Sequence, residues 1–167
     1  LEGCVSDGIK AFYAGCDSVV DMAVKAQSME GASAICLHFE SADPNGENKS
    51  VEECVAAAKE VADAIDLPLA IMGCKNGEKD ADLFNKIADA LQGKNVLFVS
   101  AKEENYKQVA ASAGLAYNQK MSAESAVDIN LAKQLNVLIS QMGLKADTYM
   151  MNVGSASAGY GFEYVVS

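Results

Sequence analysis

Short apolar runs alternate with longer amphipathic segments along the chain, a pattern that predicts strands followed by helices. The runs that predict strands are Ser33–Glu40, Pro68–Cys74, Asn95–Ala101, Tyr117–Ser122 and Thr148–Gly154. The segments that predict helices are Asp17–Met29, Val51–Ile65, Ala81–Leu91, Asn105–Ala113 and Val127–Met142. Strand starts run from residue 33 to residue 148 in four intervals of about 29 residues, the length of a βα unit.

Helix ends carry their own local signals. Ser50 with Glu53, and Ser100 with Glu103, have the spacing of a capping box, in which a hydroxyl and a carboxylate satisfy free amides at a helix start. A glycine follows each of four predicted helices, where a left-handed residue is expected: Gly31, Gly93, Gly114 and Gly143.

The middle strands predict a parallel sheet. Residues 69–72 and 96–99 are continuously apolar, as expected for strands buried on both faces. A (β/α)8 barrel takes about 250 residues, so 167 residues hold roughly five or six of its units. The alternative is an open, doubly wound sheet, whose dinucleotide-binding form has a Gly-x-Gly-x-x-Gly loop after its first strand. Here Ser41–Gly46 follows instead, a turn sequence. The residues therefore predict an α/β fold, either a partial barrel of about five to six units or an open sheet that binds no dinucleotide.

Charge and cysteine content narrow the functional classes. Thirteen Lys and Arg against 23 Asp and Glu give a net charge of −10, which argues against nucleic acid or an anionic membrane as a partner. Five widely spaced cysteines, without a Cys-x-x-Cys pair and with a single histidine, His38, do not form a metal-ligand pattern. We expect reduced thiols in a cytoplasmic protein.

Polar residues are predicted at the carboxyl ends of the strands, where α/β folds bind their ligands. The side chains placed there are mostly amides: Asn76, Asn105, Asp128, Asn130 and Asn152. A glycine-rich run, 154–161, follows the last strand and exposes its backbone to a large flat or anionic ligand. Its candidate contacts are Gly154, Ser155, Gly159, Tyr160 and Gly161. Helix capping and a plain tight loop are the structural alternatives for these residues. No catalytic residue is predicted.

Several motifs together resemble one known family. In chain order they are Asp43–Gly46, Met72–Asn76 with Glu78–Asp80 close behind, Ala101–Lys107, Val127–Asn136 and Gly159–Tyr164. From about Asp17 to Ser167 the sequence resembles the small (delta) subunit of the corrinoid iron–sulfur protein of the acetyl-CoA decarbonylase/synthase complex. Residues 1–15 match less distinctively.

The resemblance implies a TIM barrel with βα units missing at both ends, so that residues 1–167 form one segment of an incomplete domain. It implies a large partner subunit that carries a four-iron, four-sulfur cluster, with a corrinoid held between the two subunits and no cluster in this chain. It also implies methyl transfer from a methyltetrahydropterin, through a separate methyltransferase, to cobalt and on to acetyl-CoA synthase. The resemblance thus implies the acetyl-CoA (Wood–Ljungdahl) pathway of carbon fixation, and we expect this chain not to be catalytic by itself.

Two other functions remain open from the sequence. One is a corrinoid methyltransferase on the same barrel, with Asp128, Asn130 and Asn152 holding the pterin edge. The other is an unrelated barrel aldolase or phosphate-binding enzyme, which has weak support because Lys120 is the only lysine inside a predicted strand.

Overall fold

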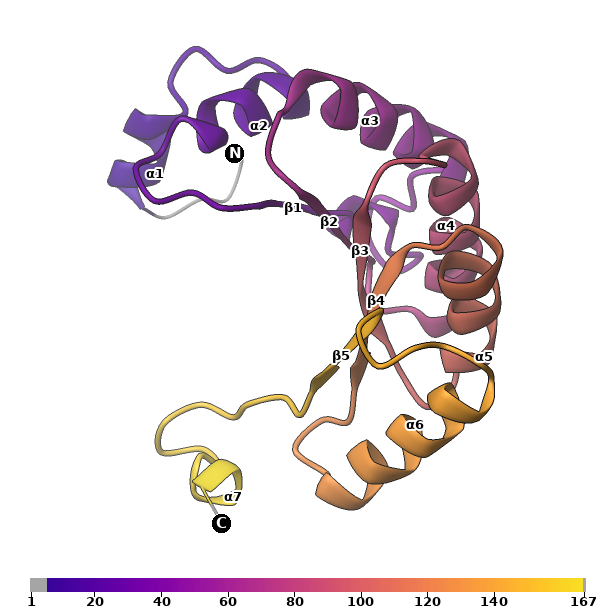
Figure 1. Cartoon of the computed structure of the whole chain (residues 1–167). Helices are drawn as coiled ribbons and strands as arrows, with labels where there is room; N and C mark the ends of the chain where they lie inside the picture. The colour runs from indigo at the N-terminus through magenta and orange to yellow at the C-terminus, as the bar shows by residue number, and fades with distance from the viewer. Residues whose placement is uncertain (1–5, 167) are drawn as a thin grey trace.

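A single parallel sheet organises the chain. The computed structural model describes residues 6–166 and contains a five-stranded sheet in the order β1-β2-β3-β4-β5, with every pair of neighbours parallel. The strands are β1 (Ile35–His38), β2 (Leu69–Met72), β3 (Val96–Ala101), β4 (Lys120–Glu124) and β5 (Tyr149–Asn152). The sheet curves into a wall that is concave on one side (Figure 1).

Helices precede, connect and follow the strands. They are α1 (Asp7–Phe12), α2 (Val19–Gln27), α3 (Val51–Ala64), α4 (Gly77–Ala90), α5 (Tyr106–Val109), α6 (Ile129–Gln141) and α7 (Glu163–Val166), with a 3-10 turn η1 (Glu40–Ala42) and a π-helical segment η2 (Ala110–Ala116). Helices α3, α4, α5 and α6 all lie along the convex side (Figure 1). Strands in chain order with helices on one side exclude the doubly wound alternative for this sheet, and the arrangement is that of a partial, barrel-like α/β fold.

The hydrophobic core lies between the sheet and these helices. Along each strand the side chains alternate, and the convex-side residues Ile71, Phe98 and Met121 are fully buried. Neighbouring positions on the concave side, such as Met72 and Leu97, are only half-buried. The sequence predicted that the middle strands are buried on both faces. Within residues 6–166 these strands are fully buried only on the convex face of the sheet.

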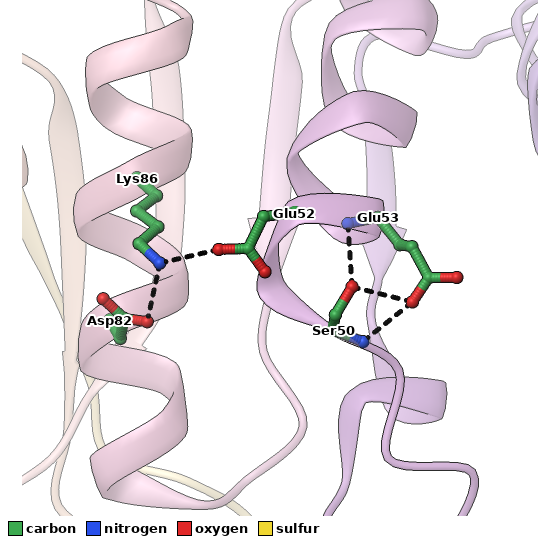
Figure 2. A network of polar contacts seen from close by, with 5 residues as sticks. All are labelled: Ser50, Glu52, Glu53, Asp82 and Lys86. Carbon is green, nitrogen blue, oxygen red and sulfur yellow. Dashed lines mark hydrogen bonds and ion pairs between the residues drawn. The ribbon is translucent and has the colours of Figure 1, made fainter.

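The predicted cap at Ser50 is confirmed. Its hydroxyl accepts from the Glu53 N–H at 3.3 Å, while the Glu53 carboxylate accepts from the Ser50 N–H at 3.0 Å (Figure 2). One residue away, Glu52 reaches across to α4 and pairs with Lys86 at 3.0 Å, which also pairs with Asp82 at 3.3 Å (Figure 2). This exposed network joins the first turn of α3 to the middle of α4. The left-handed conformations predicted at Gly31, Gly93 and Gly143 are also confirmed.

Two other predicted helix signals are wrong. Ser100 is not a cap, because it lies inside β3, where its hydroxyl contacts the Ser122 hydroxyl at 3.2 Å. Gly114 does not end a helix in a left-handed conformation, because the π-helical segment continues through it to Ala116. A Cβ at Gly114 would lie 3.3 Å from Leu144 Cγ, so the glycine there permits a close approach.

The start of β4 differs from the prediction by three residues. The sequence placed the strand at 117–122, whereas it spans Lys120–Glu124. The reason is Gln119, which is 1% exposed and turns its side chain toward the preceding unit. Its Oε1 accepts from the Val96 N–H at 2.8 Å, and its Nε2 donates to the Leu91 carbonyl at 2.9 Å. These bonds join the residue before β4 to the start of β3 and to the end of α4.

Two helices start at other residues than predicted, in each case directly after a residue whose side chain caps the first turn. Helix α4 begins four residues earlier than predicted, with Asn76 as its cap. Helix α6 begins at Ile129, because Asp128 caps it and Val127 has a φ of +67°. The predicted helix 105–113 is a short α5 that continues as a π-helix.

Candidate functional site

A polar pocket lies where four neighbouring strands end. It has a volume of about 360 Å³ and is lined from the carboxyl ends of β2, β3, β4 and β5 and the turns that follow them. Parallel strands bring these ends to one rim, so residues distant in sequence meet there. The lining residues are Met72, Gly73, Lys75, Asp80, Val99, Ser100, Lys102, Glu124, Asn152, Gly154 and Ser155.

The turn after β2 packs tightly on a buried carboxylate. Asp80, in the first turns of α4, is 6% exposed and accepts from the Cys74 N–H at 2.7 Å and from the Cys74 thiol at 3.2 Å, both through Oδ1. A Cβ at Gly73 would lie 2.6 Å from Asp80 Oδ2 and closer still to Oδ1, so only glycine fits. The positive end of the α4 helix dipole favours this carboxylate.

Burial sets the protonation of Cys74. It raises the pKa of the Cys74 thiol above its ordinary value, and the adjacent Asp80 carboxylate raises this pKa further. The thiol therefore stays protonated at neutral pH and serves as a hydrogen-bond donor to Asp80. A protonated, buried thiol is a structural group, not a nucleophile.

The ends of β4 and β5 are tied together by strained backbone. Ala126 and Val127 both have left-handed φ values, +48° and +67°, which are rare for residues with a Cβ. The Val127 N–H donates to the Val153 carbonyl at 2.6 Å, and a Cβ at Gly154 would lie 3.2 Å from the Val127 nitrogen. The Ser125 hydroxyl is buried without a hydrogen-bond partner. Strain of this kind concentrates at binding sites.

The pocket offers hydrogen bonds of both kinds. Lys75 and Lys102 supply ammonium donors, Glu124 supplies a carboxylate acceptor, and Asn152 supplies an amide. Two hydroxyls, Ser100 and Ser155, can donate or accept. The lining residues include no histidine or cysteine.

Three of the sequence-predicted site residues line this pocket: Asn152, Gly154 and Ser155. The Asn152 Oδ1 accepts from the Gly154 N–H at 3.0 Å, so the amide fixes the turn that leaves β5. Gly154 has a φ of +78°, a conformation that residues with a Cβ rarely adopt.

Three other predicted residues cap or brace helices. Asn76 accepts from the Lys79 N–H at 3.0 Å, and Asp128 accepts from the Asn130 and Leu131 N–H groups at 2.8 and 3.0 Å. Asn105 is 3% exposed, accepting from the Lys102 N–H at 2.8 Å and donating to the Gly77 carbonyl at 3.2 Å. None of the three lines the pocket, although Asn105 holds the turn that carries Lys102.

The remaining predicted residues lie farther out. Asn130 is exposed in the first turn of α6. Gly159, Tyr160 and Gly161 belong to the segment after β5, which runs out from the sheet edge toward α7 (Figure 1). Tyr160 is 86% exposed, and both glycines are left-handed, with φ of +75° and +95°.

Sequence reasoning missed Gly73, Lys75, Asp80, Ser100, Lys102 and Glu124 as pocket residues. Lys75 and Lys102 each lie within three residues of the carboxyl end of a strand. They would have been predicted if lysines near strand ends had been counted as candidate site residues. Asp80 had no such signal, because it comes from a helix and reaches the pocket through the fold.

Within residues 6–166, no three His, Cys, Asp or Glu side chains gather closely enough to hold a metal ion. Over the same residues, no helix combines the length and hydropathy that a bilayer crossing requires.

A parallel sheet in chain order, with helices on its convex side and a pocket at its carboxyl rim, defines a partial, barrel-like α/β fold. The chain belongs to the family described as CO dehydrogenase/acetyl-CoA synthase delta subunit, whose sequence profile matches residues 4–167. The family resemblance inferred from the sequence motifs is thereby confirmed.

Curated relatives agree. Acetyl-CoA decarbonylase/synthase complex subunit delta of Methanothermobacter thermautotrophicus is 33% identical over 147 residues, covering 87% of this chain and 38% of the relative. Subunit delta 1 of Methanosarcina thermophila is 31% identical over 149 residues, covering 89% and 34%. Subunit delta of Methanopyrus kandleri is 27% identical over 147 residues, covering 88% and 37%. The chain thus spans little more than a third of the length of these relatives.

Proposed function

We propose that this chain is part of a delta subunit that helps to hold a corrinoid at the carboxyl rim of its sheet. The observation that carries the proposal is the polar pocket across the ends of β2–β5 in a chain of this family. The chain binds and orients, and bond-making belongs to the cofactor. When bound, the corrinoid supplies a cobalt that carries a methyl group from a methyltetrahydropterin to acetyl-CoA synthase.

The residues present fit such a cofactor in part. A pocket of about 360 Å³ is too small for a whole corrin ring, but it has room for one of the carboxamide arms at the edge of the ring. A carboxamide both donates and accepts, and the rim offers both partners in Lys75, Lys102 and Glu124. The ring itself would lie across the mouth of the pocket.

Each predicted site residue has a place in this proposal. Asn152, Gly154 and Ser155 form the β5 side of the pocket, and Gly159, Tyr160 and Gly161 extend the contact along the exposed segment. Asn76, Asn105, Asp128 and Asn130 act through the turns that they cap or follow. Asp128 and Asn130 do not meet Asn152 in the pocket, so no observation favours the pterin-binding alternative.

The domain is proposed to be a TIM barrel completed by further βα units. The concave side of the sheet exposes Cys36, His38 and Met150, and it half-exposes Met72 and Leu97. Additional units would bury these side chains, as the closed barrel does. The acidic chain, at −10, is proposed to work in the cytoplasm beside a large corrinoid iron–sulfur subunit, the methyltransferase and acetyl-CoA synthase, with the iron–sulfur cluster in the large subunit.

Co-purification tests the proposal. The tagged chain is co-expressed with a candidate large subunit in the presence of a corrinoid, and the visible spectrum of the purified complex is recorded. We expect cobalt–corrin bands at a stoichiometric level, reduced when Lys75 and Lys102 are both changed to alanine. The Asp82→Asn variant, altered on the outer face of α4, is the matched control and should keep the bands. A complex without these bands, or bands unaffected by the pocket variant, would contradict the proposal.

A further inference from the structure

The turn between β2 and α4 forms one wall of the rim pocket and carries the exposed ammonium of Lys75. This ammonium forms no ion pair within residues 6–166. It is therefore available to a ligand. What needs explanation is how the turn holds a lysine in this place.

The backbone of Lys75 is unfavourable on its own. Its φ is +70°, in the left-handed region that residues with a Cβ seldom adopt. A free turn of the sequence Gly-Cys-Lys-Asn would relax toward an ordinary conformation and carry the side chain elsewhere. The neighbouring structure must therefore impose this conformation.

Asp80 supplies that constraint from beneath the turn. One oxygen, Oδ1, accepts from both the backbone and the thiol of Cys74, the residue before Lys75. The carboxylate also lies so close to Gly73 that no side chain fits between them. The residue is 6% exposed, so water does not compete for these bonds. Asp80 therefore fixes Cys74 through both its backbone and its side chain, and we infer that this sets the chain direction at Lys75.

We propose that Asp80 is a positioning residue that sets Lys75 against the rim pocket, where the lysine donates to an acceptor on the ligand. The ligand class rests on the proposed function: a carboxamide oxygen of a corrinoid arm. Asp80 itself lines the pocket, but the two bonds that its Oδ1 accepts both come from Cys74, so its role in this proposal is exerted through the turn. This assigns a binding role to a helix residue outside the strand-end loops.

A double-mutant cycle tests this on the complex with the large subunit, using aquocobalamin as the probe and equilibrium dialysis as the readout. Lys75→Ala should weaken binding about tenfold, the value of one charge-assisted hydrogen bond. Asp80→Ala should weaken it by the same factor, and the double variant should be no worse than either, because both remove one contact. Asp80→Asn keeps an acceptor for the Cys74 N–H and should bind within about twofold of the unchanged protein. Asp82→Asn, on the same helix but away from the pocket, should leave affinity unchanged.

A second readout is independent of any corrinoid. In the 167-residue chain, the NMR Cα and Cβ shifts of Lys75 report whether its backbone is left-handed. We expect the left-handed signature in the unchanged chain, in Asp80→Asn and in Asp82→Asn, and its loss in Asp80→Ala.

The outcomes separate the two proposals. If the losses of affinity in Lys75→Ala and Asp80→Ala multiply in the double variant, the two residues act independently and the positioning role is overturned. A tenfold loss of affinity in Asp80→Asn, with the left-handed NMR shifts of Lys75 intact, would overturn it too. Neither result would contradict corrinoid binding. Absence of cobalamin binding in every protein, the unchanged one included, would end the corrinoid assignment, and the NMR signature then decides the role of Asp80 alone. If Asp80→Ala does not fold, the Asp80→Asn and Lys75→Ala arms carry the test.

Discussion

Replacing Gln119 by leucine should destabilise the chain substantially, although Gln119 lies in the connection just before β4. The side chain is 1% exposed and bridges the start of β3 to the end of α4, accepting from the Val96 N–H and donating to the Leu91 carbonyl. Leucine has a similar volume and fills the space. The substitution therefore removes two hydrogen bonds without opening a large cavity.

The magnitude follows from the groups left behind. Both backbone partners of Gln119 are buried, and each unsatisfied group costs about 1–3 kcal/mol. The two together give a loss of about 2–6 kcal/mol, offset by the better burial of an apolar side chain, so we expect about 2–4 kcal/mol. For a chain of this length that loss lowers Tm by roughly 5–15 °C.

Urea denaturation followed by circular dichroism measures the free energy of unfolding directly. Gln92→Ala is the matched control, because that amide is exposed and bonds only to Asp89 in its own turn, and it should change stability by less than about 0.5 kcal/mol. A Gln119→Leu protein as stable as the Gln92→Ala protein would refute the bridging role of Gln119.

Three further predictions use the same measurement. Gly73→Ala should cost about 1–3 kcal/mol, because the new methyl group collides with the buried Asp80 carboxylate; no loss would show that the turn is loose. Ala126→Gly should stabilise the chain by about 0.5–1 kcal/mol, because Ala126 is exposed and its φ of +48° favours glycine; a destabilised variant would disprove the strain. The hydroxyl and N–H of Ser50 hold the pKa of Glu53 below its ordinary value, so stability from this carboxylate is present at neutral pH and is lost as the pH falls through that depressed pKa. Glu53→Gln should therefore destabilise the chain at pH about 7 and have little effect at pH about 3, and an equal effect at both would contradict the cap.

Local signals in the sequence were reliable where the interaction is local. The capping box of Ser50 and Glu53 was predictable because both partners lie within one helical turn. The same spacing at Ser100 and Glu103 misled, since Ser100 is the fifth residue of a strand and the chain does not turn into a helix until Tyr106. Spacing alone does not say whether the strand has ended.

Interactions between units were out of reach for the sequence. Gln119 bonds to groups 23 and 28 residues away, and nothing around it distinguishes a buried amide from an exposed one. In the sequence, Asp80 is one of several acidic residues in the first turns of α4. Its burial depends on the close approach of Gly73, in the turn after β2. The rim was predictable in outline, because parallel strands must end together. The turns decide which side chains line the pocket: Asn76 and Asp128 cap helices, whereas Lys75 and Lys102 line the pocket.

Hydrogen–deuterium exchange on the complex with the large subunit, with and without bound cobalamin, tests the central claim that the carboxyl rim of the sheet holds the cofactor. We expect cobalamin to slow exchange in the segments 73–75, 100–102 and 153–155, which surround the pocket, and to leave the segments 66–68 and 92–95 at the opposite end of the sheet unchanged. Protection confined to that opposite end, or unchanged exchange at the rim in a complex that retains cobalamin, would contradict it.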